Sequence, residues 1–384
     1  MNAVTLKPGR ERSVLQGHPW IFSGAIESGC DIPAATPVQV FSSKSEVLGT
    51  GIYSPASMIR VRLLKGDIKD LVRKAIGKRT FLSAASAARL IYAENDGIPG
   101  LIVDSYANHF VLQITSALAE YYKPQILEVL QEYHPKSISE RLDTDARKKE
   151  GLEVGTWRLL AGDNPPDLIE IEENGLKFLV DIRKGHKTGY YLDQREARAL
   201  VGSLSKDKTV LNCFCYTGGF GLYAACGGAK EVTQVDLSEE ALALAQKNAE
   251  LNAGGLKSTP TIVRADVFKY LRFLRDAGRH FDLIVLDPPK FAESKSQLMK
   301  AARGYKDINL LAMKLLAPGG TLATFSCSGA MTPEFFDTIL REASVDAKRD
   351  FQIIARTRQA SDHPVALNFP EGLYLKGVVL RAND

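Results

Sequence analysis

The second half of the chain alternates apolar strand-like runs with helix-like segments, and this rhythm restricts the fold more than any other feature. From about residue 183 onward, the predicted strands end near Cys213, Val235, Arg264, Leu286 and Phe325. Alternation of strand, helix and strand is typical of a parallel sheet with helices on both faces. Two later strands, near 351–356 and 373–380, complete the predicted α/β, Rossmann-like doubly wound sheet.

The first half of the chain has a different sequence pattern, and we expect two further domains there. Residues 1–67 contain short β-type runs broken by glycine and proline, which favours a small β-barrel-like domain. Residues 68–182 mix both kinds of element, as in a small α+β domain. Its helices are predicted near 69–88 and 119–132, and its strands near 100–104, 109–115 and 168–181. The doubly wound domain then covers residues 183–384.

The amino-acid composition argues against a membrane or secreted, disulfide-rich protein. At 45% hydrophobic and 24% charged residues, the chain is typical globular material, and no apolar run approaches the roughly 20 residues of a membrane helix. The N-terminus has no signal-peptide core, and the five cysteines fit neither a disulfide framework nor a zinc site. We therefore expect a cytoplasmic protein without a metal. A net charge of +4 permits an RNA partner but does not require one.

A glycine-bearing loop follows the first strand of the predicted doubly wound domain. It contains Tyr216, Thr217, Gly218 and Gly219, and it leads into a helix. Glycines let the backbone approach a ligand, and a helix N-terminus offers free N–H groups. The spacing is not that of the dinucleotide fingerprint, so a pyrophosphate cradle and a nicotinamide dehydrogenase are disfavoured.

Two carboxylates follow the next two predicted strands. Asp236 is placed to accept the hydroxyls of a ribose, and Asp266 can accept the exocyclic amine of adenine, with Val267 or Phe268 against the ring. Ribose and adenine without pyrophosphate indicate S-adenosyl-L-methionine. The alternative is that both carboxylates simply cap the helices that follow.

The fourth and fifth predicted strands end in a possible reacting site. Asp287 is followed by Pro288 and Pro289, which cannot continue a ladder, and Cys327 follows the fifth strand. The carboxyl ends of parallel strands open onto one crevice, so a carboxylate that binds a base edge would face a thiol. The alternatives are an ordinary turn at Asp287 and a buried, inert thiol at Cys327.

A thiol and a carboxylate in this arrangement suit the methylation of a pyrimidine. Cytosine C5 is a poor nucleophile, but addition of a thiolate to C6 turns C5 into an enamine carbon that can attack a methyl sulfonium. Nucleophilic catalysis of this kind divides one difficult step into two easier ones. The pattern therefore predicts Cys327 as the nucleophile and Asp287 as the contact to the base.

The sequence resembles the RlmI-type 23S ribosomal RNA cytosine-C5 methyltransferases, which carry an N-terminal PUA domain. The resemblance extends over nearly the whole chain. It rests on His18–Ile26, Glu94–Asp104, Gly189–Arg195, Asn212–Phe220, Asp287–Phe291, Ser326–Ser328, Asp362–Pro364 and Phe369–Gly372. The resemblance implies that Cys327 is the nucleophile, that Asp287 contacts the target cytosine, and that Gln194 and Arg195 lie near the cofactor.

The expected site residues follow from the motifs and the resemblance together. The catalytic set is Cys327, Asp287 and Lys290. The cofactor set is Gln194, Arg195, Asn212, Phe214, Tyr216, Thr217, Gly218, Gly219, Asp236, Asp266, Val267 and Asp287. Many related enzymes have a second cysteine for product release at the position of Lys290. Release here needs another base, such as water, Lys290 or a carboxylate, and Lys290 could equally bind phosphate or be a solvated lysine.

The resemblance implies 23S ribosomal RNA as the partner and suggests a possible homodimer, and no DNA or membrane partner is expected. Candidate RNA contacts are Lys7, Arg10, Arg12, Arg60 and Arg62, together with a cluster formed by Arg141, Arg147, Lys148 and Lys149 that is either an RNA contact or a solvated loop. Two other functions stay open. One is methylation of a base amino group or of guanine, and the other is a non-catalytic RNA-binding assembly factor.

Overall fold

The computed structural model describes residues 2–79, 87–291 and 295–384 and groups them into two compact units. The first unit holds the described residues up to Ile171, with Val180–Leu192 and Ser361–Gly372. The second unit holds Glu172–Leu179, Asp193–Ala360 and Leu373–Asp384. Among the helices of these residues, none has both the length and the apolar composition needed to cross a membrane.

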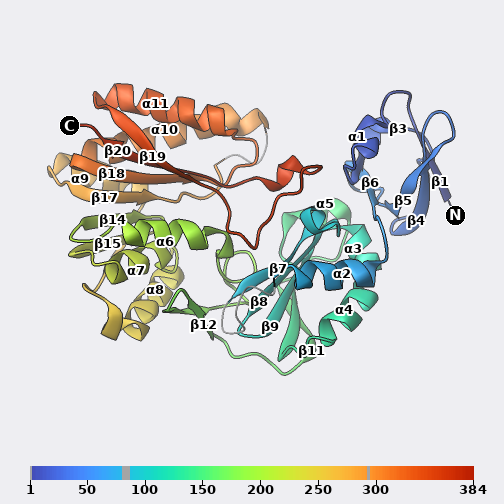
Figure 1. Ribbon diagram of the computed structural model, residues 1–384, viewed down its shortest axis with the longest axis horizontal. Helices are drawn as coiled ribbons and strands as arrows, with labels where there is room; N and C mark the ends of the chain where they lie inside the picture. The colour runs from blue at the N-terminus through green and yellow to red at the C-terminus, as the bar shows by residue number, and fades with distance from the viewer. Residues whose placement is uncertain (1, 80–86, 292–294) are drawn as a thin grey trace. The chain divides into compact units, whose positions relative to one another are not determined.

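The N-terminal part of the first unit, drawn in blue in Figure 1, is a six-stranded sheet. Its strand order is β2-β6-β5-β4-β1-β3. Its elements are β1 (Asn2–Leu6), α1 (Arg12–Leu15), β2 (Trp20–Phe22), β3 (Ile26–Ser28), β4 (Thr36–Phe41), β5 (Val47–Tyr53) and β6 (Ile59–Leu63). Alternate residues of β4, Val38 and Val40, are fully buried in the same core cluster as Val61 of β6. This period of two is that of a strand with one face in a core, and the predicted β-rich domain is confirmed.

The first unit also contains a five-stranded sheet with strand order β11-β10-β9-β8-β7. Its strands are β7 (Ala88–Tyr92), β8 (Leu101–Tyr106), β9 (His109–Ile114), β10 (Ser137–Arg141) and β11 (Trp157–Gly162). Its helices are α2 (Ile68–Gly77), α3 (Ala117–Tyr121), α4 (Lys123–Gln131) and α5 (Asp145–Glu150). A two-stranded hairpin follows in the chain, formed by β12 (Ile169–Glu173) and β13 (Leu176–Val180), and its residues Glu172–Leu179 belong to the second unit.

The predicted mixture of helices and strands is present in this region, but two helices have other bounds than predicted and several elements were missed. The helix predicted near 69–88 ends at Gly77, and residue 88 belongs to a strand; residues 80–86 lie outside the described part. The helix predicted near 119–132 is two helices, and Pro124 lies in the first turn of the second. Strands β7, β10 and β11 and helix α5 were missed. Strand β10 has a polar sequence, Ser-Ile-Ser-Glu-Arg, although every residue in it is buried.

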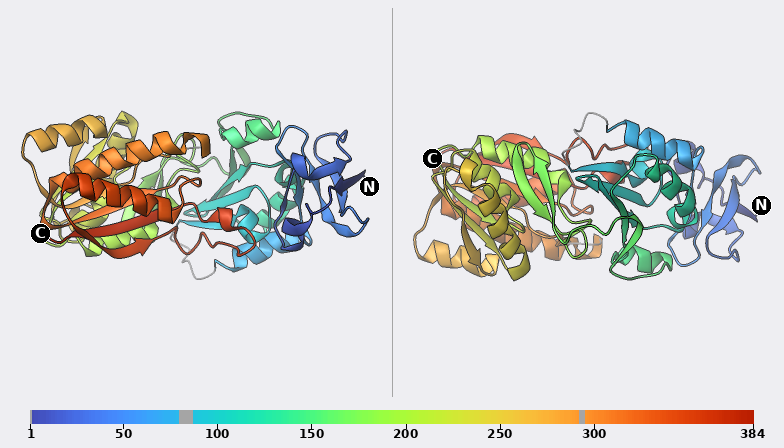
Figure 2. Two further views of the ribbon diagram at one scale, coloured as in Figure 1. Left: turned by 90° about the horizontal axis from the view of Figure 1, so that it is seen from above. Right: turned by 90° about the horizontal axis from the view of Figure 1, so that it is seen from below.

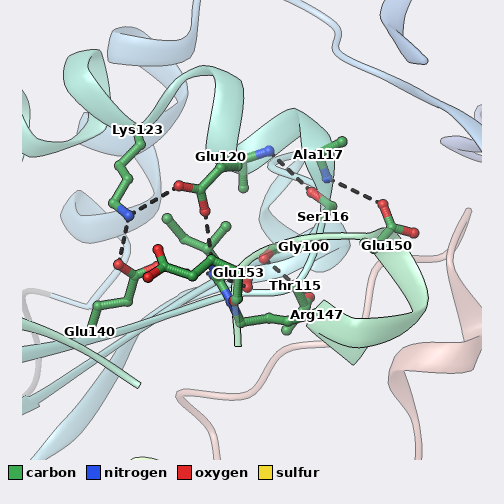
Figure 3. A network of polar contacts seen from close by, with 12 residues as sticks. Gly100, Thr115, Ser116, Ala117, Glu120, Lys123, Glu140, Arg147, Glu150 and Glu153 are labelled. Atoms are coloured by element: carbon green, nitrogen blue, oxygen red, sulfur yellow. Dashed lines mark hydrogen bonds and ion pairs between the residues drawn. The ribbon is translucent and has the colours of Figure 1, made fainter. Parts of the chain in front are cut away.

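A buried ion network explains how β10 can be polar and internal (Figure 3). The fully buried carboxylate of Glu140 accepts a hydrogen bond of 3.0 Å from Arg147 Nη1 and one of 2.6 Å from Lys123 Nζ. Arg158 Nε donates a third, of 2.9 Å. A buried charge is tolerated when it is paired and hydrogen-bonded in this way.

This network corrects part of the predicted RNA surface. Arg147 is 1% exposed, and the buried Arg141 pairs with Asp143, so neither arginine is an RNA contact or part of a solvated loop. Arg62 is also buried, and its Nη1 lies 2.7 Å from Glu150 Oε2. These side chains stabilise the first unit from inside.

The second unit is built on a seven-stranded sheet with strand order β16-β15-β14-β17-β18-β20-β19. The strands are β14 (Thr209–Cys213), β15 (Glu231–Asp236), β16 (Thr261–Arg264), β17 (Phe281–Leu286), β18 (Leu316–Ser326), β19 (Phe351–Thr357) and β20 (Lys376–Ala382). The first five pair in parallel, and β20 is antiparallel to both of its neighbours. The predicted doubly wound sheet is therefore confirmed, with an antiparallel edge formed by the two last strands.

Helices cover both faces of this sheet. They are α6 (Arg195–Ser203), α7 (Gly219–Cys226), α8 (Glu239–Leu251), α9 (Val267–Asp276), α10 (Leu298–Leu315) and α11 (Pro333–Ala347). In β17, Ile284 packs in the core with α9, α10 and α11, whereas its neighbours Leu283 and Val285 pack with α6 and α7. The two helix groups lie on opposite sides of the sheet (Figure 1), and α10 and α11 run side by side (Figure 2).

The network around Glu140 generates a stability prediction. We expect Glu140→Ala to lower the free energy of unfolding by about 3 to 5 kcal/mol, because the change removes the fully buried carboxylate that Lys123, Arg147 and Arg158 share. Glu128→Ala is the matched control, since Glu128 pairs with Lys69 but is 61% exposed, and it should cost no more than about 1 kcal/mol. Urea unfolding followed by circular dichroism measures both values, and equal effects would contradict the structural role of the network.

Candidate active site

The parallel strands β14, β15, β16 and β17 place four loops at one edge of the sheet. Register pairs Cys213 with Val235 and with Leu286, so these strands end at the same level. Ligands of open α/β sheets bind at this carboxyl edge. All predicted cofactor and catalytic residues except Gln194 and Arg195 come directly from these strand ends, their following turns, or the end of β18.

The loop after β14 has an unusual backbone. Phe214 and Tyr216 adopt positive φ angles of 58° and 49°, although neither is glycine, and Gly218 has φ of 87°. Such conformations are costly for residues with side chains and persist where the surroundings impose them. Here Asp236 Oδ2 accepts a hydrogen bond of 2.9 Å from the Tyr216 backbone N–H. The carboxylate after β15 thus holds the loop after β14.

The two carboxylates predicted to bind the cofactor have different local roles. Asp236 does not cap α8, because Ser238 does so; its Oδ1 instead accepts the backbone N–H groups of Leu237 and Ser238. Asp266 does cap α9 through Oδ1, which accepts from Lys269 N at 3.0 Å. Both are partly exposed, and Oδ2 of Asp266 accepts no hydrogen bond from any residue that the structure describes. The capping alternative is thus wrong for Asp236 and right for one oxygen of Asp266.

Buried polar atoms without a partner gather near the same loop. Within the described residues, Oε1 of Gln194, Oδ1 of Asn212 and Oγ1 of Thr217 have no hydrogen-bond partner, although each side chain is at most 3% exposed. Unsatisfied buried polar groups are rare in folded proteins, and each needs an explanation. A polar ligand seated on the loop would supply the missing partners.

The two ends of the predicted reacting pair lie in one neighbourhood. Gln194 Nε2 donates a hydrogen bond of 3.0 Å to Oδ1 of Asp287, which follows β17. Cys327 follows β18, the neighbour of β17, and it is partly exposed. The alternative of a fully buried thiol at Cys327 is therefore wrong, and its reactivity stays a prediction.

Tyr305 of α10 lies near both groups. Its hydroxyl accepts a hydrogen bond of 3.0 Å from Ser326 Oγ, next to Cys327. Burial raises the pKa of the Tyr305 phenol, and negative charge on Cys327 and on Asp287 raises it further. Both groups are thus near enough to the phenol to act on it electrostatically. Sequence reasoning missed Tyr305 because it lies in the middle of a helix far from either motif.

The remaining cysteines behave as packing residues or have no role at this edge. Cys213 is fully buried and Cys215 is 6% exposed, and burial raises the pKa of both thiols far above the usual range. Both thiols therefore pack in the interior beside the loop. Cys30 and Cys226 are exposed.

The other predicted residues are placed as follows. Lys290 is exposed, whereas the ring of Phe291 packs on that of Tyr305, with 4.7 Å between the ring centroids.

Val267 is buried in the core. The neighbouring Phe268, whose ring contacts that of Phe214, is therefore the better placed of the two to meet a ligand. Arg195 is 8% exposed, and its Nε lies 3.6 Å from Glu173 Oε2.

A second residue near Cys327 also escaped the sequence reading. Lys376 begins β20 and is only 7% exposed, and its Nζ donates hydrogen bonds of 2.6 Å to the backbone oxygens of Ser328 and Tyr374. The sequence feature that could have revealed it is the position of this lysine directly before the apolar run Gly377–Leu380.

Comparisons with known proteins agree with this architecture. A family model of S-adenosylmethionine-dependent methyltransferases matches residues 153–366, and a PUA-like domain model matches residues 4–65. A solved structure from Streptococcus mutans, described as a SAM-dependent methyltransferase, has a TM-score of 0.85 at 23% identity and covers 99% of this chain and 100% of its own. A methyltransferase solved in complex with SAH has a TM-score of 0.84 at 22% identity, covering 99% and 100%. These two likenesses support the fold.

Two relatives cover essentially the whole chain. The ribosomal RNA large subunit methyltransferase I of Tolumonas auensis is 50% identical over 394 residues, with 99% of each chain covered. The Escherichia coli protein of the same name is 48% identical over 394 residues, with 98% of each covered. The chain therefore belongs to the ribosomal RNA large subunit methyltransferase I family of S-adenosylmethionine-dependent methyltransferases, with an N-terminal PUA-like domain.

Proposed function

We propose that this protein methylates C5 of a cytosine in 23S ribosomal RNA through a covalent bond between Cys327 and C6 of the base. The names of the relatives support ribosomal RNA of the large subunit as substrate. The observation that carries the choice of C5 chemistry is the partly exposed thiol of Cys327, beside Tyr305 and the Asp287 carboxylate at the edge of the sheet. We place this activity in the cytoplasm, where ribosomal RNA is made in bacteria such as those of the relatives.

The proposed reaction uses each of these residues. The Cys327 sulfur forms a bond to C6, and the electrons of the C5–C6 double bond make C5 nucleophilic. Asp287 accepts a hydrogen bond from the cytosine amine and holds the ring in place. After C5 has gained its methyl group, a base removes the C5 proton, and the S–C6 bond breaks with its electron pair returning to sulfur. Lys290, Asp287 or water remain the candidates for that base.

The cofactor site fits S-adenosylmethionine, which supplies an electrophilic methyl group when bound. Asp236 would accept the ribose hydroxyls, Asp266 Oδ2 would accept the adenine amine, and Phe268 would contact the ring. The partnerless polar atoms of Gln194, Asn212 and Thr217 would bind the polar groups of the cofactor. Glycines also matter locally, since a Cβ on Gly221 would lie 2.3 Å from Gln234 Oε1 beneath the loop.

RNA binding is assigned to the PUA-like domain. Lys7, Arg10 and Arg12 are exposed there, and Arg10 lines a pocket of about 270 Å³ together with Trp20 and Phe22. Cations position a phosphate backbone, and aromatic rings can stack on unpaired bases. The target cytosine must leave its stack to reach Cys327, which is least costly in single-stranded or loop RNA.

The role of Cys327 predicts a specific loss. Cys327→Ala should reduce formation of 5-methylcytidine in 23S ribosomal RNA by about 1000-fold or more, because the nucleophile that activates C5 is gone. Cys226→Ala, which changes an exposed cysteine on α7, should retain normal activity. Nucleoside mass spectrometry of RNA methylated in vitro measures both. Near-normal turnover by Cys327→Ala would refute the nucleophile, and N4-methylcytidine or a methylated purine would refute the product.

The role of Asp236 predicts weaker cofactor binding. Asp236→Asn should raise the Kd for S-adenosylhomocysteine by roughly 10- to 100-fold, because hydrogen bonds to a charged acceptor contribute about 1.5 to 3 kcal/mol. Asp282→Asn is the control, since Asp282 also accepts a backbone N–H, that of Thr209, but lies at the opposite edge of the sheet. Isothermal titration calorimetry measures both. An unchanged Kd in Asp236→Asn would rule out the ribose contact.

A further inference from the structure

Lys376 is a buried cation for which the described structure provides no anion. Its side chain is 7% exposed, and no described carboxylate lies within ion-pair distance of it. Lysines are rarely buried unless they are paired, because removing an ammonium from water without a counter-charge is costly. Its two hydrogen bonds go to backbone oxygens, which leaves one of the three N–H donors of the ammonium unassigned among the described residues.

The backbone places this ammonium beside Cys327. Antiparallel pairing of β18 and β20 sets Lys376 opposite Ser326, the residue before Cys327. The Nζ atom then donates to the oxygen of Ser328, the residue after Cys327, at 2.6 Å. Lys376 thus meets the chain on both sides of the thiol, with its backbone opposite Ser326 and its ammonium on Ser328. The electrostatic interaction is mutual, because negative charge on Cys327 favours the protonated form of Lys376.

We propose that Lys376 is a positioning residue that holds the sulfur of Cys327 as a thiolate, forming a lysine–thiolate ion pair at the end of β18. This inference rests on the proposed nucleophilic role of Cys327. It assigns to Lys376 a role that neither the sequence motifs nor the names of the relatives supply.

The ion pair would act twice in the reaction. A thiolate, not a thiol, attacks C6, and an unperturbed cysteine titrates near ~8.5, so a nearby cation increases the reactive fraction at neutral pH. The thiolate is also the leaving group when the S–C6 bond breaks and its electron pair returns to sulfur. Lys376 keeps its proton in both steps and faces the sulfur anion before attack and after release.

The other groups that face Cys327 do not provide this stabilisation. Tyr305, from α10, has a phenol whose pKa is raised by burial, so it is neutral at neutral pH. Asp287, from the end of β17, carries negative charge that opposes a thiolate. Burial lowers the pKa of Lys376 to about 8, so the lysine is still mostly protonated at pH 7, and a neighbouring thiolate strengthens its hold on the proton.

The test is the pH dependence of alkylation by iodoacetamide, in a background that carries Cys30→Ala and Cys226→Ala. Cys327 is then the accessible thiol, since Cys213 and Cys215 are buried. We expect the midpoint of the rate profile to lie below ~8.5 with Lys376 present.

Lys376→Met should raise this midpoint by about 1 to 3 pH units and slow alkylation at pH 7 by roughly tenfold or more. Lys376→Arg should restore a low midpoint, and Lys314→Met, on the exposed face of α10, should change nothing.

Equal midpoints in the wild-type background and in Lys376→Met would overturn the ion pair. If Lys376→Met does not fold, as judged by circular dichroism, the wild-type midpoint decides alone, and a value at or above ~8.5 overturns the inference. These readouts need neither RNA nor cofactor. A failure here is therefore distinct from a failure of the proposed function, which shows as loss of the Cys327 requirement for 5-methylcytidine.

Discussion

Parallel pairing of β14, β15, β17 and β18 is the constraint on which the rest of the second unit depends. It brings residues from positions 212 to 327 to one edge of one sheet, although they are far apart in the chain. Loops at this edge take their shape from their neighbours: Asp236 after β15 binds the backbone after β14, and Gln194 binds Asp287 after β17. The site is thus a set of strand ends that hold one another, and a change in the register of one strand would separate them.

The antiparallel strand β20 adds a second constraint that the parallel strands alone could not supply. Because β20 runs opposite to β18, its first residue meets the last residues of β18, and a lysine is delivered beside Cys327. Tyr305 reaches the same place from α10 on one face of the sheet. The thiol therefore lies among a cation, a neutral phenol and a carboxylate, an arrangement suited to chemistry in which sulfur is first a nucleophile and then a leaving group.

Much of this could be predicted from the sequence where the signal is local. Apolar runs ending in Asp or Cys revealed the strands of the second unit, and buried parallel strands have such near-continuous apolar sequences. Strand β10 escaped because its buried residues are polar and are stabilised by Lys123, Arg147 and Arg158, which come from other elements. The same cause misled the reading of Arg62 and Arg147 as RNA contacts: charge is visible in a sequence, but its partner is not.

The residues of the site, too, could be predicted where the signal is local and were missed where it depends on distant elements. Cys327, Asp287 and Asp236 follow strands directly, so their convergence could be predicted; Tyr305 and Lys376 depend on helix packing and on the direction of β20. The covalent role of Cys327 is tested by RNA containing 5-fluorocytidine, whose C5 fluorine cannot leave as a proton does. We expect a stable protein–RNA adduct whose cross-linked peptide contains Cys327. Adduct formation at a different residue, or none with RNA that is otherwise methylated, would contradict it.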